Sequence, residues 1–354
     1  MNRLLSRATR RAARTHVRHV GVVAPAAADG LVARVYAQLE HDFGMFAPPV
    51  VVHSAAPALL AACWTMLRET LLARGRADRA AKERVAVAVS LANTCPYCVD
   101  VHGAALHALS ADRGAGRAGR GGDVRDARVR DVERWVRGAS SHPGKAEPEL
   151  LGVALTFHYL NRVVNVFLTE SPFPAGTPDR LRGSLRSLVG QMLHRQVRRS
   201  LPPGASLELL PDAAPLPADL AWAAGSPHVG GALARAAAAF EEAGRRWVPE
   251  RVRELLLTDL ARQDGEDGQD GGGGGPGRAW AGEAAAALPA AERAAGRLAL
   301  LTARASYQVL PVDVRAYRDT AEDDAAVVGM VAWAAFTAAR RSAARLGGAP
   351  AAGR

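Results

Sequence analysis

The chain has 354 residues, a formal net charge of +10 and three cysteines, and its length favours two domains of ordinary size. Almost all of the positive charge is arginine, since Lys82 and Lys145 are the only lysines, and alanine and glycine are similarly abundant. This bias toward arginine, alanine and glycine is typical of a GC-rich gene. The sequence shows no basic patch interleaved with aromatic residues and no helix-turn-helix signal, which argues against nucleic-acid binding. Three cysteines fit a reducing cytoplasm better than export.

The chain begins with an arginine-rich segment. Met1 to Arg18 contains no acidic residue and resembles a transit-type segment, but it lacks the apolar core of a secretory signal. We therefore predict that residues 1–28 form a basic, disordered arm.

Residues 29–168 are predicted to form a helical, catalytic unit. The stretch Asp78–Ala92 lacks Gly and Pro and is rich in helix formers, so it predicts one helix. Pro96 is tolerated in a first helical turn, which predicts a second helix from the cysteines to about Leu109. Cys98 then lies near the positive end of that helix dipole.

The most informative motif is Cys95-Pro96-Tyr97-Cys98. Glu83 stands twelve positions before the first cysteine and His102 four after the second. On one helix, Cys98 and His102 share a face, and Cys95 lies within disulfide reach of Cys98. Because the thiolate is the reactive form of cysteine, a nearby base and a second thiol indicate redox chemistry.

Zinc, haem and thioredoxin-like sites fit this cluster less well. A structural zinc site needs four ligands, and Cys95, Cys98 and His102 supply three, with only distant Cys63 or another histidine to complete them. A c-type haem motif requires histidine where Val99 stands, and a thioredoxin-like site requires a βαβ unit that the helical flanks do not offer. We expect no metal and no cofactor. Cys63 and His158 are expected to be core residues.

The residues Lys82 to Arg84, the apolar helix, the Cys95–Cys98 motif and His102 resemble the alkylhydroperoxidase D-like and carboxymuconolactone decarboxylase-like family. The resemblance covers about residues 40–168. In its cysteine-pair peroxidase branch the second cysteine attacks peroxide, the first resolves, and a Glu and a His relay protons. These roles fall on Cys98, Cys95, Glu83 and His102.

The resemblance implies a thiol-dependent peroxidase acting on hydrogen or organic peroxides. It also implies an external dithiol reductant, of which a lipoyl-type carrier is the candidate, and a homo-oligomer. One departure is Tyr97, where the best-known members carry a histidine before the second cysteine. A general dithiol–disulfide oxidoreductase and a non-catalytic redox-sensing or assembly protein stay open as alternatives. Phe43, Phe46, Trp64 and Tyr97 are candidates for an apolar peroxide pocket, or plain core.

The apolar stretch Leu150–Leu168 is long, but His158, Asn161, Arg162 and Asn165 interrupt it, so we predict a core helix and no membrane contact. Residues 169–220 are proline-rich around one basic stretch, Arg180 to Arg199, and are predicted to be a linker with a basic helix.

Residues 221–354 are predicted to be a second, degenerate helical repeat, which makes the protein all-α with two units in tandem. Pro249 to Val252 matches Lys82 to Val85, and this register puts Arg262, Gly265 and Gln269 where the first unit has Cys95, Cys98 and His102. The second unit therefore lacks the chemistry, and its segment 263–278 is predicted to be a Gly-rich flexible loop.

Overall fold

Helices make up the fold throughout the described part of the chain. The computed structural model describes residues 10, 15–110, 127–138, 140, 148–173, 177–212, 215–266 and 277–347. Within these ranges the regular elements are helical, and strand-like pairing is limited to two isolated bridges, Val17 with Leu168 and Ala73 with Leu201. The all-α prediction is confirmed.

The described residues of the first unit form seven α-helices. They are α2 (Gly30–Gln38), α3 (Pro48–Val51), α4 (Pro57–Leu67), α5 (Arg79–Ala92), α6 (Pro96–Ser110), α7 (Ala127–Val136) and α8 (Pro148–Phe167). Two wide π-helical turns extend α2 and α4, namely η2 (Leu39–Phe43) and η4 (Arg68–Leu72). The helices that follow are α9 (Asp179–Val197), α10 (Pro227–Trp247), α11 (Glu250–Glu266), α12 (Arg278–Ala285), α13 (Arg293–Ala305), α14 (Pro311–Arg318) and α15 (Asp324–Leu346). Short 3₁₀ turns connect them: η1 (Pro25–Ala27), η3 (Val52–Ala55), η5 (Leu207–Leu209), η6 (Ala218–Gly225), η7 (Ala290–Glu292) and η8 (Ser306–Gln308).

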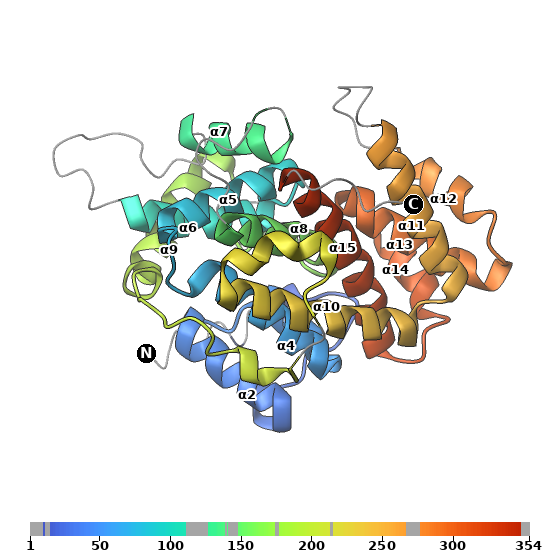
Figure 1. Ribbon diagram of the computed structural model, residues 1–354, viewed down its shortest axis with the longest axis horizontal. Coiled ribbons are helices and arrows are strands. Elements are labelled where there is room, and N and C mark those ends of the chain that lie inside the picture. Colours follow the sequence, from blue (N-terminus) through green and yellow to red (C-terminus); the bar gives the residue numbers. More distant parts are fainter. Residues whose placement is uncertain are drawn as a thin grey trace.

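The two halves of the chain share one hydrophobic core. In Figure 1 the long helices α8, α10 and α15 lie in the middle, with α5, α6 and α9 on one side and α11 to α14 on the other. An aromatic cluster joins the three central helices: the Tyr159 and Phe240 rings are 4.9 Å apart, and Phe240 stacks on Phe336 at 4.4 Å. Such pairs stabilise beyond simple burial, so neither half is an independent module.

Helix α8 is long and apolar enough to cross a membrane by length and composition alone. However, 89% of its apolar window is buried inside the protein, where it packs against α5 and α15. This is the environment of a core helix.

The second half repeats some features of the first. Helices α4 and α10 both begin at a proline after a 3₁₀ turn, and α8 packs along α15. In α13 of the second half, Leu298 to Ala303 are all buried, as Val85 to Ser90 are in α5. Helix α11, by contrast, buries a single face.

Burial thus favours α13 and α14 as the counterparts of α5 and α6, since α14 begins at Pro311 as α6 begins at Pro96. The register that matches Pro249–Val252 to Lys82–Val85 would pair α11 with α5 instead. Local matches between alanine-rich helices do not distinguish these registers, because many positions carry the same small residue. The tandem repeat stays a prediction.

Parts of the predicted arm and loop lie outside the described residues, namely 1–9, 11–14 and 267–276, and Gln269 lies among them. The described end of the arm runs beside the end of α8, where the Arg18 N–H donates to the Phe167 carbonyl at 2.7 Å. In the predicted linker, α9 packs along α6. Buried Asp100 of α6 binds Arg182 and Arg186 of α9, each at 3.0 Å.

A buried histidine makes the fold sensitive to acid. The Nδ1 of His53 lies 2.9 Å from the Val50 carbonyl, so it carries the proton, and Nε2 accepts from the Tyr159 hydroxyl at 2.5 Å. Burial lowers the pKa of His53 to about 4. Native His53 therefore stays neutral where the unfolded chain, with an ordinary pKa near 6.5, binds a proton.

We expect the unfolding free energy to fall as pH drops from about 6.5 to about 4, with up to about 3 kcal/mol of the loss due to His53. Urea unfolding of the wild type and His53→Gln at pH 7 and pH 5 measures this contribution. The variant should be less stable at pH 7 but lose less on acidification. An equal loss in both proteins would assign the acid sensitivity to other groups, of which buried His158 is the first to test.

Candidate active site

The site is built where α5 turns into α6. Asp78 caps the start of α5 by accepting from the Ala81 N–H at 2.6 Å. At the other end Thr94 adopts a left-handed conformation with φ of 51°, and the Cys95 N–H donates to the Ser90 carbonyl at 2.9 Å. This tight connection folds α6 back against α5, so the side-by-side packing that contact between Glu83 and His102 requires is present.

Glu83 and His102 form a direct pair. The His102 Nδ1 lies 2.8 Å from one oxygen of Glu83, and Arg79, one turn earlier on α5, contacts the other oxygen at 2.7 Å. Burial alone would raise the pKa of Glu83, but the charges of Arg79 and His102 hold it below its ordinary value. The carboxylate is therefore ionised, orients the imidazole, and leaves Nε2 for proton exchange.

Both cysteines of the motif are buried and reduced, with 1% of Cys95 and 3% of Cys98 exposed. Burial, and then the hydrogen bond with Cys95, raise the pKa of Cys98 well above its ordinary value, while a hydrogen bond from Asn161 opposes the rise. Burial outweighs the favourable helix N-terminus that the position of Cys98 in the sequence suggests. At neutral pH Cys98 is thus a thiol that needs a base.

A buried amide network, which the motif spacing does not reveal, lies behind the cysteines. Asn161 of α8 donates to the Ser90 hydroxyl at 3.0 Å and accepts from Asn93 at 3.0 Å, and Asn93 also contacts His158 at 3.1 Å. The signal available in the sequence was the set of polar residues within this apolar stretch, since buried polar groups are kept only when they are paired. His158 is a buried core histidine, as expected.

Cys98 and His102 line the same small cavity, whose volume is about 40 Å³. This is room for a few waters or a small peroxide. Phe43 and Tyr97 also line it, as predicted, and Phe157 sets its ring edge against His102 at 4.5 Å. The other aromatic candidates are elsewhere: Phe46 packs on Tyr36, and Trp64 donates to Gln38.

The remaining cysteine is not part of the site. Cys63 is buried in α4, and its sulfur lies 3.9 Å from the Pro49 carbonyl. Across the described ranges, no group of three or more His, Cys, Asp or Glu side chains is placed to hold a metal ion.

A helical bundle in which a cysteine pair opens a helix beside a buried Glu–His pair defines an alkylhydroperoxidase-like protein of the carboxymuconolactone decarboxylase family. The chain belongs to this family. Residues 57–114 match the carboxymuconolactone decarboxylase family. The chain is also 37% identical over 337 residues to the alkyl hydroperoxide reductase Rv2159c of Mycobacterium tuberculosis, covering 92% of this chain and 93% of that protein. No solved structure matches the chain significantly.

Replacing Asn161 should disturb Cys98 specifically. Asn161→Ala removes a donor that stabilises the thiolate, so the pH at which Cys98 ionises should rise, and the hydrogen bonds that Ser90 and Asn93 lose should cost about 1–3 kcal/mol of stability. The rate of thiol alkylation as a function of pH measures the ionisation, in a Cys63→Ala background.

Asn165→Ala is the matched control. Asn165 lies one turn further along α8 and bonds the Asn93 carbonyl and the Ser306 hydroxyl, but not Cys98. Equal shifts in the two variants would mean that Asn161 affects Cys98 only through packing.

Proposed function

We propose that the protein is a thiol-dependent peroxidase that reduces hydrogen or organic peroxides through Cys98 and Cys95. The observation that supports this proposal is that Cys98 and His102 line the same small buried cavity, while the ionised Glu83 binds the Nδ1 atom of His102. The named activity of the mycobacterial relative, an alkyl hydroperoxide reductase, supports the same class of reaction.

The chemistry requires a proton relay. His102 takes the proton of the Cys98 thiol, and Glu83 stabilises the imidazolium. The thiolate attacks the distal peroxide oxygen: the S–O bond forms, the O–O bond breaks, and the proton goes to the leaving alcohol or water. Cys98 becomes a sulfenic acid.

The resolving step uses the neighbouring thiol. Cys95, whose thiol is hydrogen-bonded to Cys98, attacks the sulfenic sulfur, a disulfide forms, and water leaves. An external dithiol then reduces the disulfide and is itself oxidised. We assign attack to Cys98 because it lines the cavity, whereas Cys95 does not.

Burial of both sulfurs also helps to choose between a peroxidase and a general dithiol–disulfide oxidoreductase. A general dithiol–disulfide oxidoreductase must present a sulfur to a bulky disulfide, whereas a peroxide fits a small cavity, so the geometry favours the peroxidase. A lipoyl-type carrier as reductant, a homo-oligomeric state and a cytoplasmic location belong to this proposal, as the family resemblance and the cysteine content support them.

The two cysteines should have separable roles. Cys98→Ser should abolish peroxide consumption, whereas Cys95→Ser should still form a sulfenic acid but should not recycle. A sulfenic-acid probe with mass spectrometry, after one equivalent of peroxide, identifies the attacking residue. Cys63→Ser is the control and should keep full turnover. Labelling of Cys95 in the wild type would reverse the assignment.

The proton relay through His102 and Glu83 should affect how the peroxide reaction rate depends on pH. A general base contributes about 10²–10⁴-fold, so His102→Ala or Glu83→Gln should lower the peroxide reaction rate at neutral pH by an amount in this range. Because the pKa of Cys98 is raised, the residual rate should increase as pH rises and hydroxide ionises the thiol. Stopped-flow peroxide reduction from pH 6 to 10 tests this. A loss that is equal at every pH would indicate structural damage.

A further inference from the structure

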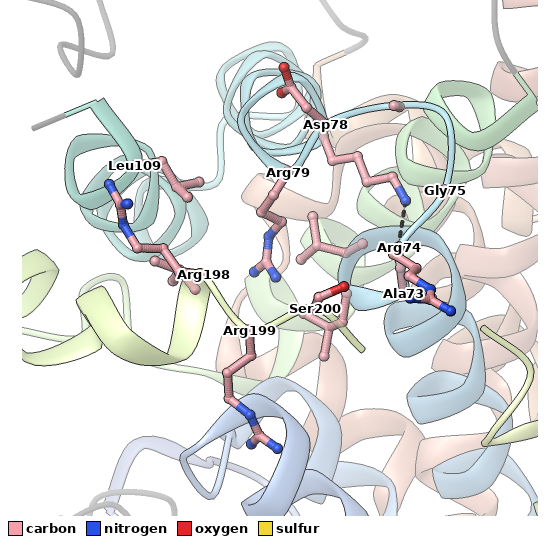
Figure 2. A pocket seen from close by; sticks show the side chains of 14 residues that line it. Ala73, Arg74, Gly75, Asp78, Arg79, Leu109, Arg198, Arg199 and Ser200 are labelled. Carbon is pink, nitrogen blue, oxygen red and sulfur yellow. Dashed lines mark hydrogen bonds between the residues drawn. The ribbon is translucent and has the colours of Figure 1, made fainter. Parts of the chain in front are cut away.

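A pocket of about 470 Å³ opens to solvent beside the proton relay, between the start of α5 and the end of α9 (Figure 2). Four arginines line it, namely Arg74, Arg79, Arg198 and Arg199. They come from three places in the chain: the loop before α5, the first turn of α5, and the residues that follow α9. Arg79 is the same residue that contacts Glu83.

The charge of this pocket is strongly positive. Asp78 is its one acidic lining residue, and its carboxylate already caps α5. Lys82 also reaches the pocket, but its ammonium group donates to the Ala73 carbonyl at 2.9 Å and contacts Glu149 at 3.2 Å. Arg79 is paired with Glu83, and Arg199 donates to the His41 carbonyl, which carries no charge, so the pocket keeps an excess of positive charge. Guanidinium groups match the geometry of a carboxylate.

The arginine pocket is the first of three adjoining hollows. It shares Leu72, Arg79 and Val197 with a second hollow of about 20 Å³, which extends to Glu83 and His102. The second hollow shares with the Cys98 cavity the residues Phe43, Met45, Val101 and His102. The side chains shared along this path are mainly apolar, apart from Arg79 and His102. The middle hollow is also lined by Asp42, Glu83 and Gln196, so the three hollows adjoin one another, with arginines at the outer end and mainly apolar side chains around the Cys98 cavity.

We propose that these hollows bind an aliphatic carboxylic acid that carries a hydroperoxide group, with its carboxylate among the arginines and its chain directed toward Cys98. The reaction of this ligand rests on the proposed function, whereas its binding does not. A small neutral peroxide carries no charge to pair with the arginines, and an inorganic anion has no alkyl chain to contact the apolar side chains around the Cys98 cavity. Half-buried Met45 has a flexible side chain that can move to admit an alkyl chain.

Substrate preference is the first test. The kcat/KM of a hydroperoxy fatty acid is compared with that of its methyl ester, in the wild type and in Arg74→Gln. Arg74 is exposed, and its backbone N–H bond to the Leu201 carbonyl survives the change. We expect the wild type to prefer the acid by about fivefold and the variant to lose most of that preference.

Arg245→Gln is the matched control, because Arg245 is an exposed arginine on α10 that pairs with Glu242. It should keep the wild-type preference for the acid. Equal use of acid and ester by the wild type, or an equal loss of preference in both variants, would overturn the inference.

Binding is tested without any reaction by calorimetry with decanoate, acetate and inorganic phosphate. Decanoate should bind best, and Arg74→Gln should weaken its binding by about fivefold. Equal binding of all three anions would show a general anion site and overturn the proposed chain path. If no peroxide is consumed, the proposed peroxidase function fails, while decanoate binding still decides this inference. If neutral peroxides are consumed but decanoate does not bind, only this inference fails.

Discussion

The buried carboxylate of Glu83 is the constraint on which the catalytic half depends. A fully buried charge is tolerated only when it is paired and hydrogen-bonded, and here Arg79 and His102 provide the partners from α5 and α6. Removing Arg79 would leave the carboxylate without its cationic partner, and removing His102 would leave its second oxygen without a hydrogen bond. The same requirement that holds the two helices together also fixes the imidazole beside Cys98, so stability and reactivity share one set of contacts.

Around this pair, the other helices bury most of the site, and the arginine pocket is the side that opens to solvent. Helix α8 covers the cysteines with Asn161 and Phe157, and α9 covers α6 through Asp100 and its two arginines. The second half contributes α15 and α10, which complete the core around α8. It also contains an ionic cluster, in which buried Asp313 of α14 binds the partly exposed Arg278 and Arg297.

The features that could be predicted from the sequence are the local ones. The boundaries of α5 and α6 follow from composition and from Pro96, and the motif spacing places Glu83, Cys98 and His102 within reach of each other. The contact of Asn161 with Cys98 and the packing of α9 on α6 depend on segments more than 60 residues from the motif, which no periodicity reveals. The register of the second unit stays a prediction, because alanine-rich local similarity pairs α11 with α5 whereas burial favours α13.

The depth of the cysteine pair has a kinetic consequence for the disulfide that it would form. A peroxide can diffuse to Cys98, but a dithiol attached to a larger carrier cannot reach sulfurs that are 1% and 3% exposed in the closed structure. In the proposed cycle, reduction would therefore wait for a local opening of the helices over α6, and at high reductant concentration its rate would become the opening rate. Oxidation and reduction of one pair of atoms are then limited by different physical events, one chemical and one conformational.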